Sequence, residues 1–312
     1  MNNRWLLVSV LMFVVTAGWA KSNHSYPLDV PLTSERAVSF NVQEGELILR
    51  GDPHATSIHM EVSIDRFFIF RLGEQDILSK LIKVSRDAHS VSIATDIPRS
   101  IANWGRAEYP IDLIVTVPAG MNVKVRDTSG IIEISDVTGP VAIEDGSGTL
   151  KATRLGGSLQ IVKDSGDMFI QQVTGETKIN SRSGQLHFEN LAKLDVLNSD
   201  GNLYIANVDS ADIHNDSGNV RVIGVKGALA LHDSSGEIFI RDVGGTVDIT
   251  DTSGQIRVIN SGAVTIGDTD GNITVENAPR LKVSRKDSGE VMVRNVQGEV
   301  AVPSKIKVRR KA

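Results

Sequence analysis

The feature that most constrains the fold of this chain is a glycine that returns every 17 or 18 residues between Gly130 and Gly289. The ten glycines are Gly130, Gly148, Gly166, Gly184, Gly201, Gly218, Gly236, Gly254, Gly271 and Gly289. A short fixed period is typical of a solenoid, in which every coil reverses direction at the same place. Glycine suits such a reversal because it adopts positive φ without strain. We therefore predict that these ten are structural turn glycines.

Apolar residues follow each turn glycine at fixed offsets. The second and fourth positions after the ten glycines hold twenty residues, and all are apolar, whereas a hydrophobic content of 40% predicts about eight. A period of two indicates a strand with one buried face. One coil buries too little to offset the entropy of ordering its backbone, so coils must stack. The prediction is an all-β fold, a single-stranded β-solenoid (β-helix) of about ten coils of 17–18 residues.

The repeat divides the chain into segments. Residues 21–121 lack the repeat and predict an irregular N-terminal β-rich cap or lobe with a short helix near residues 75–83. Residues 122–303 form the predicted solenoid domain, and residues 304–312 form a basic C-terminal tail. Caps are expected because an open solenoid exposes unpaired strand edges.

Residues 1–20 resemble a secretory signal peptide. Arg4 precedes an apolar run at residues 5–15, and Gly18 and Ala20 suit a cleavage site. An uncleaved anchor is the alternative, although the run is short against the roughly 20 residues that span a bilayer. We expect an exported protein, periplasmic or at the cell surface. The chain has no cysteine, which excludes disulfides and thiolate chemistry.

Charge is unevenly distributed. Residues 280–312 hold ten Lys or Arg against three Asp or Glu, although the whole chain carries −5. The basic C-terminal tail is interpreted as a guard against strand addition. The alternative is contact with an anionic envelope surface. Because the rod is acidic and the chain is exported, no nucleic acid partner is expected.

The third position after the turn glycine points outward and is unusual in composition. On consecutive coils it holds Phe169, His187, Tyr204, Arg221, Phe239 and Arg257. Aromatic rings interleaved with Arg at the strand spacing predict a candidate binding face for an envelope protein or a glycan polymer. The alternative interpretation is that these neighbours only stabilise the sheet.

Three further lines of polar residues are candidates for metal or structural positions. His214 and His232 share one line and form a weak candidate for Zn²⁺ or Cu²⁺. Asp233, Asp251 and Asp268 form another, for which turn hydrogen bonding is favoured over Ca²⁺. Asn190, Asn207, Asn260, Asn277 and Asn295 form a third, interpreted as structural. No metal and no cofactor is predicted.

Two stretches resemble a known family. They are "YPIDLIVTVPAGMNVKVRDTSG" at residues 109–130 and coils such as "DSSGEIFIRDVGGTVDITDTSG". They are similar to a bacterial β-strand-repeat family of unknown function whose members are called adhesins. The resemblance implies a β-solenoid and an adhesin-like role, and it supplies no catalytic motif.

The predicted function is that of a non-enzymatic scaffold, an adhesin-like binding or spacer protein of the bacterial cell envelope. Ser and Asp recur in every coil, which is typical of turns and not of one activated nucleophile. Two alternatives stay open. One is a self-associating structural element, and the other is a carbohydrate-active enzyme with a site near Trp104.

Overall fold

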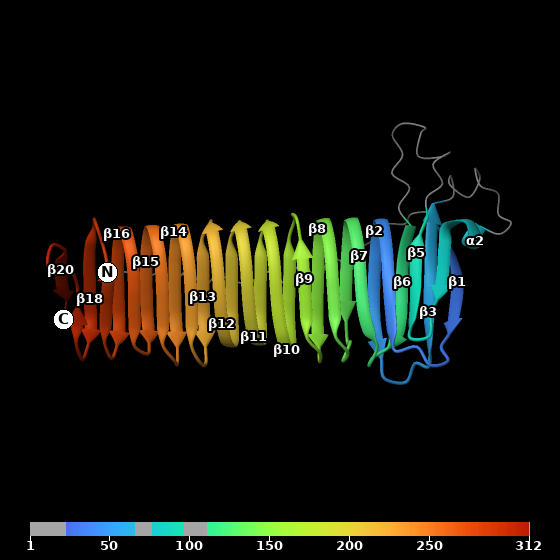
Figure 1. Cartoon of the computed structure of the whole chain (residues 1–312), viewed down its shortest axis with the longest axis horizontal. Helices are drawn as coiled ribbons and strands as arrows, with labels where there is room; N and C mark the ends of the chain where they lie inside the picture. The colour runs from blue at the N-terminus through green and yellow to red at the C-terminus, as the bar shows by residue number, and fades with distance from the viewer. Residues whose placement is uncertain (1–22, 66–76, 97–110, 312) are drawn as a thin grey trace, which may run out of the picture.

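The protein is an elongated rod of stacked coils (Figure 1). The computed structural model describes residues 23–65, 77–96 and 111–311. Within those residues the only helix is α2 (Ile77–Leu81), which lies inside the predicted helical stretch 75–83, and a strand begins directly after it. No described helix has the length and apolarity needed to cross a bilayer. The predicted signal peptide lies outside the described residues.

Strands occupy most of the described chain. The N-terminal part contains β1 (Asn23–Pro31), β2 (Ala37–Asp52), β3 (Ser57–Asp65), β4 (Ile82–Arg86), β5 (Ser90–Thr95) and β6 (Ile111–Pro118). The first half of the repeat contains β7 (Asn122–Ser135), β8 (Val141–Leu155), β9 (Leu159–Lys163), β10 (Met168–Ser183), β11 (Leu186–Asp200) and β12 (Leu203–Ser217). The second half contains β13 (Val220–Val225), β14 (Leu229–Val243), β15 (Val247–Ser261), β16 (Val264–Ala278), β17 (Leu281–Arg285), β18 (Glu290–Val296), β19 (Val300–Ala301) and β20 (Lys307–Lys311).

The register between coils confirms the β-solenoid. Strands of the repeat pair in parallel with the strand one coil later, so that Gly236 faces Gly254, and Gly254 faces Gly271. All twenty apolar residues that follow the turn glycines are at most 3% exposed. They belong to one continuous cluster of buried hydrophobic side chains that runs from Val30 in β1 to Val293 in β18. The coils therefore share a single axial core.

The turn glycines are required for two separate reasons. All ten have positive φ, with Gly254 at +143°. The stacked turns also approach very closely, because a Cβ atom on Gly254 would collide with the carbonyl oxygen of Gly236 in the preceding coil. Each turn glycine of the repeat meets the glycine before it in the same way. Any other residue would force neighbouring coils apart as well as strain its own backbone.

A second corner of each coil uses the left-handed conformation without glycine. Six residues after the turn glycine, nine non-glycine residues have φ between 50° and 62°. Asn tolerates this region better than most side chains. The amides also bond along the axis, since Nδ2 of Asn277 donates to Oδ1 of Asn260 at 2.7 Å and Nδ2 of Asn295 donates to Oδ1 of Asn277 at 2.8 Å. The Asn line is thus both a corner and a hydrogen-bonded ladder.

The solenoid register continues past the predicted repeat into the N-terminal part. β2 pairs in parallel with β7, which aligns Gly45 with Gly130. On its other side β2 pairs in parallel with β5 and β6. The blue strand β2 accordingly lies between β6 and β7 in Figure 1. Gly45 also has positive φ, at +126°, so it is one more turn glycine. A coil formed by residues 37–52 is therefore inserted between coils that come later in the chain.

The N-terminal end is closed by antiparallel strands. β3 runs antiparallel to β6, β1 to β3, and β4 to β5. These antiparallel strands end the parallel stacking, so this end of the rod does not expose the edge of a parallel coil.

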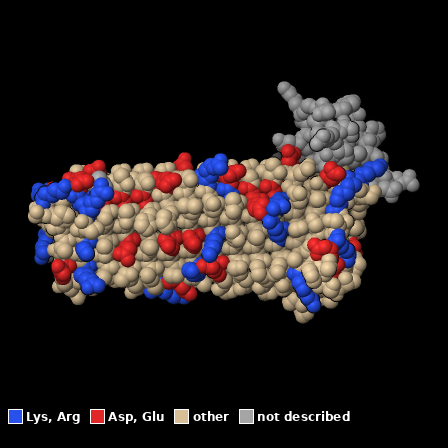
Figure 2. All heavy atoms as spheres, viewed as in Figure 1, with Lys and Arg blue, Asp and Glu red and all other residues tan. Residues whose placement is uncertain are grey.

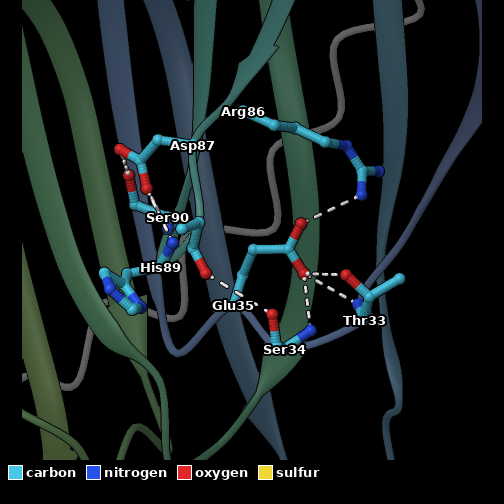
Figure 3. A network of polar contacts seen from close by, with 8 residues as sticks. Thr33, Ser34, Glu35, Arg86, Asp87, His89 and Ser90 are labelled. Carbon is cyan, nitrogen blue, oxygen red and sulfur yellow. Dashed lines mark hydrogen bonds and ion pairs between the residues drawn. The ribbon is translucent and has the colours of Figure 1, made fainter.

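A polar network fastens the hairpin of β4 and β5 to the segment between β1 and β2 (Figure 3). Oε2 of Glu35 accepts hydrogen bonds from the backbone nitrogens of Thr33 and Ser34, at 2.7 and 3.0 Å. Its Oε1 accepts from Nη1 of Arg86 at 3.1 Å. The backbone bond from Thr33 makes the largest contribution to lowering the pKa of Glu35 to about 2. The side chain is therefore an ionised anchor for the cap.

The predicted basic tail folds as the last strand. β20 pairs in parallel with β18 and places Val308 beside Val291. Oε1 and Oε2 of Glu290 pair with Lys307 and Arg309 at 3.3 and 2.8 Å, and Lys305 pairs with Asp287 at 2.9 Å. Figure 2 shows basic side chains gathered near the C-terminal end of the rod with acidic ones beside them. Much of the basic charge is thus neutralised locally.

Candidate binding face

The six residues of the predicted binding face lie on one straight line across strands β10 to β15. The parallel register pairs Phe169 with His187, and Tyr204 with both His187 and Arg221. It then pairs Phe239 with Arg221 and Arg257. We call this line the aromatic ladder. Its position follows from the repeat, because each member stands between two inward apolar residues of its own strand.

Neighbouring members of the aromatic ladder touch. The ring centroids of Phe169 and His187 are 6.1 Å apart, and those of His187 and Tyr204 are 4.6 Å apart with planes inclined by 20°. Farther along, Cζ of Arg221 lies 4.5 Å from the centroid of the Phe239 ring, which is a cation–π contact. These contacts hold the rings in fixed orientations on the sheet.

The ladder remains accessible despite these contacts. Phe169 is 41% exposed and belongs to the few large apolar side chains that the described surface leaves open. Tyr204 and Phe239 are half-buried, and Arg221 is exposed. The guanidinium of Arg257 forms an ion pair, with its Nη2 3.1 Å from Oε1 of Glu276. The free part of the ladder therefore lies over β10 to β14.

Side chains on both flanks add polar and apolar character. One flank carries amides, in which Nδ2 of Asn202 donates to Oε1 of Gln185 at 3.3 Å, and Oδ1 of Asn202 accepts from the backbone nitrogen of Asn219 at 2.9 Å. The other flank is mixed, with the half-buried Ile223 and Ile259 on the same line as Glu189 and Arg241. The result is a rigid surface with rings at its centre and hydrogen-bonding groups at its side. Sequence reasoning did not identify the flanks because their residue types vary from coil to coil.

Backbone groups on the ladder strands are not available to a ligand. Each strand from β10 to β14 is paired in parallel with a neighbour on both sides. A peptide therefore has no open edge to join there, and a ligand would have to be recognised by side chains.

The two candidate metal ligands lie on the other side of the turn glycine. His214 and His232 stack with ring centroids 4.6 Å apart and planes inclined by 17°. Across residues 23–65, 77–96 and 111–311, no group of three or more His, Cys, Asp or Glu is placed to hold a metal ion. The same line contains Leu197, which is 54% exposed. The two histidine rings therefore stack on one another, and their role as metal ligands stays a weak prediction.

Two grooves lie away from the aromatic ladder. An apolar groove of about 520 Å³ at the cap is lined by Tyr26, Leu28, Leu78 and Val84, among others. A mixed-charge groove of about 440 Å³ near the C-terminal end is lined by Asp248, Arg280, Lys282 and Glu299, among others. No ladder residue lines either groove. Trp104, the centre of the enzyme alternative, lies outside the described residues.

Together these features define an all-β solenoid whose repeated coils present side-chain ladders to solvent. The family described as Toastrack DUF4097 matches residues 113–304, which include the whole predicted repeat domain, residues 122–303. The chain belongs to that family. No curated protein matches it.

The chain also has a low similarity to several solved structures. A putative cell adhesion protein from Clostridium sporogenes is 12% identical with a TM-score of 0.29, over 93% of this chain and 100% of that one. A putative adhesin from Parabacteroides merdae is 12% identical with a TM-score of 0.35, over 89% and 96%. A putative adhesin from Parabacteroides distasonis is 11% identical with a TM-score of 0.34, over 90% and 98%.

Proposed function

We propose that this protein is a non-enzymatic, exported scaffold of the bacterial cell envelope that binds an extended glycan along the aromatic ladder. The single observation that carries the proposal is the unbroken line of rings and guanidinium groups across consecutive coils. The resemblance of residues 1–20 to a signal peptide supports export.

The spacing of the rings favours a linear polymer. Phe169, Tyr204 and Phe239 stand on every second coil, so successive rings are separated by two strand spacings, about 9.6 Å. A chain of sugar rings can place alternate residues over such a row and direct its hydroxyls to the amides of Gln185 and Asn219. A glycan is favoured over a peptide because the backbone of these strands is already paired.

Co-sedimentation with insoluble glycans tests this function. The probes are peptidoglycan sacculi, chitin and cellulose, and the variant is Tyr204→Ser combined with Phe239→Ser. Each lost ring contact is worth about 1–1.5 kcal/mol, so the double variant should bind roughly 30- to 140-fold more weakly.

The matched control replaces exposed apolar residues on the segment before the turn. Val162→Ser combined with Leu197→Ser removes side chains that are 44% and 54% exposed and should leave binding unchanged. Absence of wild-type binding to all three glycans, or equal binding by both double variants, would contradict the proposal. Release of soluble sugar from any probe would instead favour the enzyme alternative.

Self-association and the anionic envelope surface remain separate proposals for the C-terminal end. β20 has a pairing partner on one side only among the described residues. Size measurement in solution distinguishes a monomeric scaffold from a polymer formed through that edge.

A further inference from the structure

A column of polar side chains runs inside the rod, three residues before each turn glycine. From the N-terminal side it reads Asp127, Asp145, Lys163, Ser181, Asn198, Asn215, Asp233, Asp251, Asp268 and Lys286. The register stacks these positions from Asp127 to Asp233, and Asp251 on Asp268. The pairs on either side of Asp233 and Asp251 place these two next to each other, and a hydrogen bond joins Lys286 to Asp268. From Asp145 onward every member is at most 6% exposed. The line of acidic residues interpreted from the sequence as turn chemistry is therefore part of the core.

Hydrogen bonds within the column converge on its C-terminal half. Nδ2 of Asn198 donates to Oδ1 of Asn215 at 2.7 Å, and Nδ2 of Asn215 donates to Oδ1 of Asp233 at 2.8 Å. From the other end Nζ of Lys286 donates to Oδ2 of Asp268. Asp251 lies between these two carboxyls, and the backbone nitrogen of Ser253 donates to its Oδ1 at 3.3 Å.

The three carboxyls have too few donors and too little positive charge. Oδ2 of Asp233, Oδ2 of Asp251 and Oδ1 of Asp268 are buried without a hydrogen-bond partner. If all three were ionised, the single ammonium of Lys286 would leave two negative charges uncompensated in the core. Such charges are strongly unfavourable, and so is a buried acceptor without a donor. A proton on one carboxyl removes a charge and turns an acceptor into a donor.

We propose that Asp233, Asp251 and Asp268 form an internal proton-binding site, in which a proton held on Asp251 is donated to the unpartnered oxygen of one neighbour, Asp233 or Asp268. The site is independent of the aromatic ladder. Its ligand is the proton itself, and its effect is to couple the stability of the rod to pH.

The charged groups that face the site determine the direction of this coupling. The charges of the exposed Asp216 of β12 and Asp270 of β16 act on Asp233 and Asp268, and Lys286 is the one cation paired with the triad among the described residues. Burial, followed by the charges of Asp233 and Asp268, raises the pKa of Asp251 to about 7. Burial likewise raises the pKa of Asp233 to about 6.

The direction of the pH dependence follows from comparing the pKa of Asp251 in the folded rod with its pKa in the unfolded chain. A folded pKa above the ordinary value of 3.8 means that the folded rod binds the proton more tightly. The resulting stabilisation is complete below pH 3.8 and is lost as the pH rises through about 7. The rod should therefore unfold more easily at alkaline pH.

The test compares urea unfolding of the wild type with Asp251→Asn at pH 5.5 and pH 8.5 in EDTA. Asn already occupies this position at Asn198 and Asn215, so the column accommodates the amide. The matched control is Asp248→Asn, which changes an exposed aspartate on the same strand β15. We expect the urea concentration at the unfolding midpoint to fall between pH 5.5 and pH 8.5 for the wild type and the control. It should fall clearly less for Asp251→Asn, so that at pH 8.5 this variant has the highest midpoint of the three proteins.

Several outcomes would overturn the proposal. One is an equal pH-dependent loss in all three proteins. A second is restoration of the wild type at pH 8.5 by added Ca²⁺ or Na⁺, which would make the site a metal site. If Asp251→Asn does not fold, ¹³C NMR titration of the wild-type carboxyls decides. A carboxyl of Asp251 that titrates near 7 supports the site, and one ionised down to pH 4 contradicts it.

Discussion

His187 and Tyr204 occupy the same position in adjacent coils and stack with ring centroids 4.6 Å apart. The parallel register imposes this geometry, because it places residues at equivalent positions of adjacent coils one strand spacing apart. A ligand that meets the rings therefore finds them already ordered, which lowers the entropic cost of binding. The same contact also stabilises the sheet, so the two roles of the ladder have to be separated by experiment.

Loss of Tyr204 should affect binding far more than folding. Because the ring is half-buried on the outer surface, Tyr204→Ser should lower the free energy of unfolding by only about 1 kcal/mol. Urea unfolding followed by far-ultraviolet circular dichroism measures this value. A loss comparable to that of a core truncation would show that the ladder is chiefly a structural element.

Replacement of a turn glycine should be severe. Gly254→Ala forces alanine into φ of +143° and drives its Cβ into the carbonyl of Gly236, so a loss of at least about 3 kcal/mol is expected. Gly120→Ala is the matched control, because a Cβ there meets nothing within 4 Å. Thermal unfolding of both variants checks the difference. Equal stability of the two would contradict the close stacking of turns.

The buried pair of Lys163 and Asp145 offers a pH-dependent prediction. Lys163→Met leaves the carboxylate of Asp145 uncompensated and should cost about 3–5 kcal/mol at pH 8. Burial already raises the pKa of Asp145, so the cost should shrink as the pH falls and this carboxyl takes up a proton. Combining the variant with Asp145→Leu should recover most of the loss at pH 8. A cost that is the same at pH 5 and pH 8 would contradict this account.

Glu35 should stabilise the cap with the opposite pH dependence. Its pKa is lowered from 4.5 to about 2, so its contribution is fully present above pH 4.5 and is lost as the pH falls through about 2. Glu35→Gln should therefore lower the melting temperature at pH 7, and the gap to the wild type should close near pH 2. Hydrogen exchange of β4 and β5 locates the effect. If the difference in melting temperature persists at pH 2, the loss of the Glu35 charge does not explain the effect of the substitution.

The repeat part of the fold could be predicted because its determinants are local and periodic. Gly236 and Gly254 recur at a fixed interval, and the residues two and four positions later, such as Ile238 and Ile240, alternate with polar ones. Gly45 escaped prediction because the cap strands separate it from Gly130, with which it stacks. No period within the sequence could reveal that β2 is inserted between later coils.

The sequence predicts which residues of neighbouring coils share a line on the surface, but not how their side chains contact one another. The sequence interval places Arg221 and Phe239 side by side, yet only the structure shows the guanidinium over the ring. The interior column was harder to interpret, because Asp251 has the residue type of a turn and does accept the backbone bond of one. Its burial at 3% exposure depends on the coil path and not on local preference.

Binding of a length series of oligosaccharides, taken from the glycan that co-sediments with the protein, tests the central claim most directly. Phe169 and Phe239 are four strand spacings apart, about 19 Å. Calorimetric affinity should therefore rise until the oligosaccharide spans all three rings and then level off, and Tyr204→Ser should remove the middle increment. An affinity that does not depend on length, or one that Tyr204→Ser leaves unchanged, would contradict the ladder as the binding face.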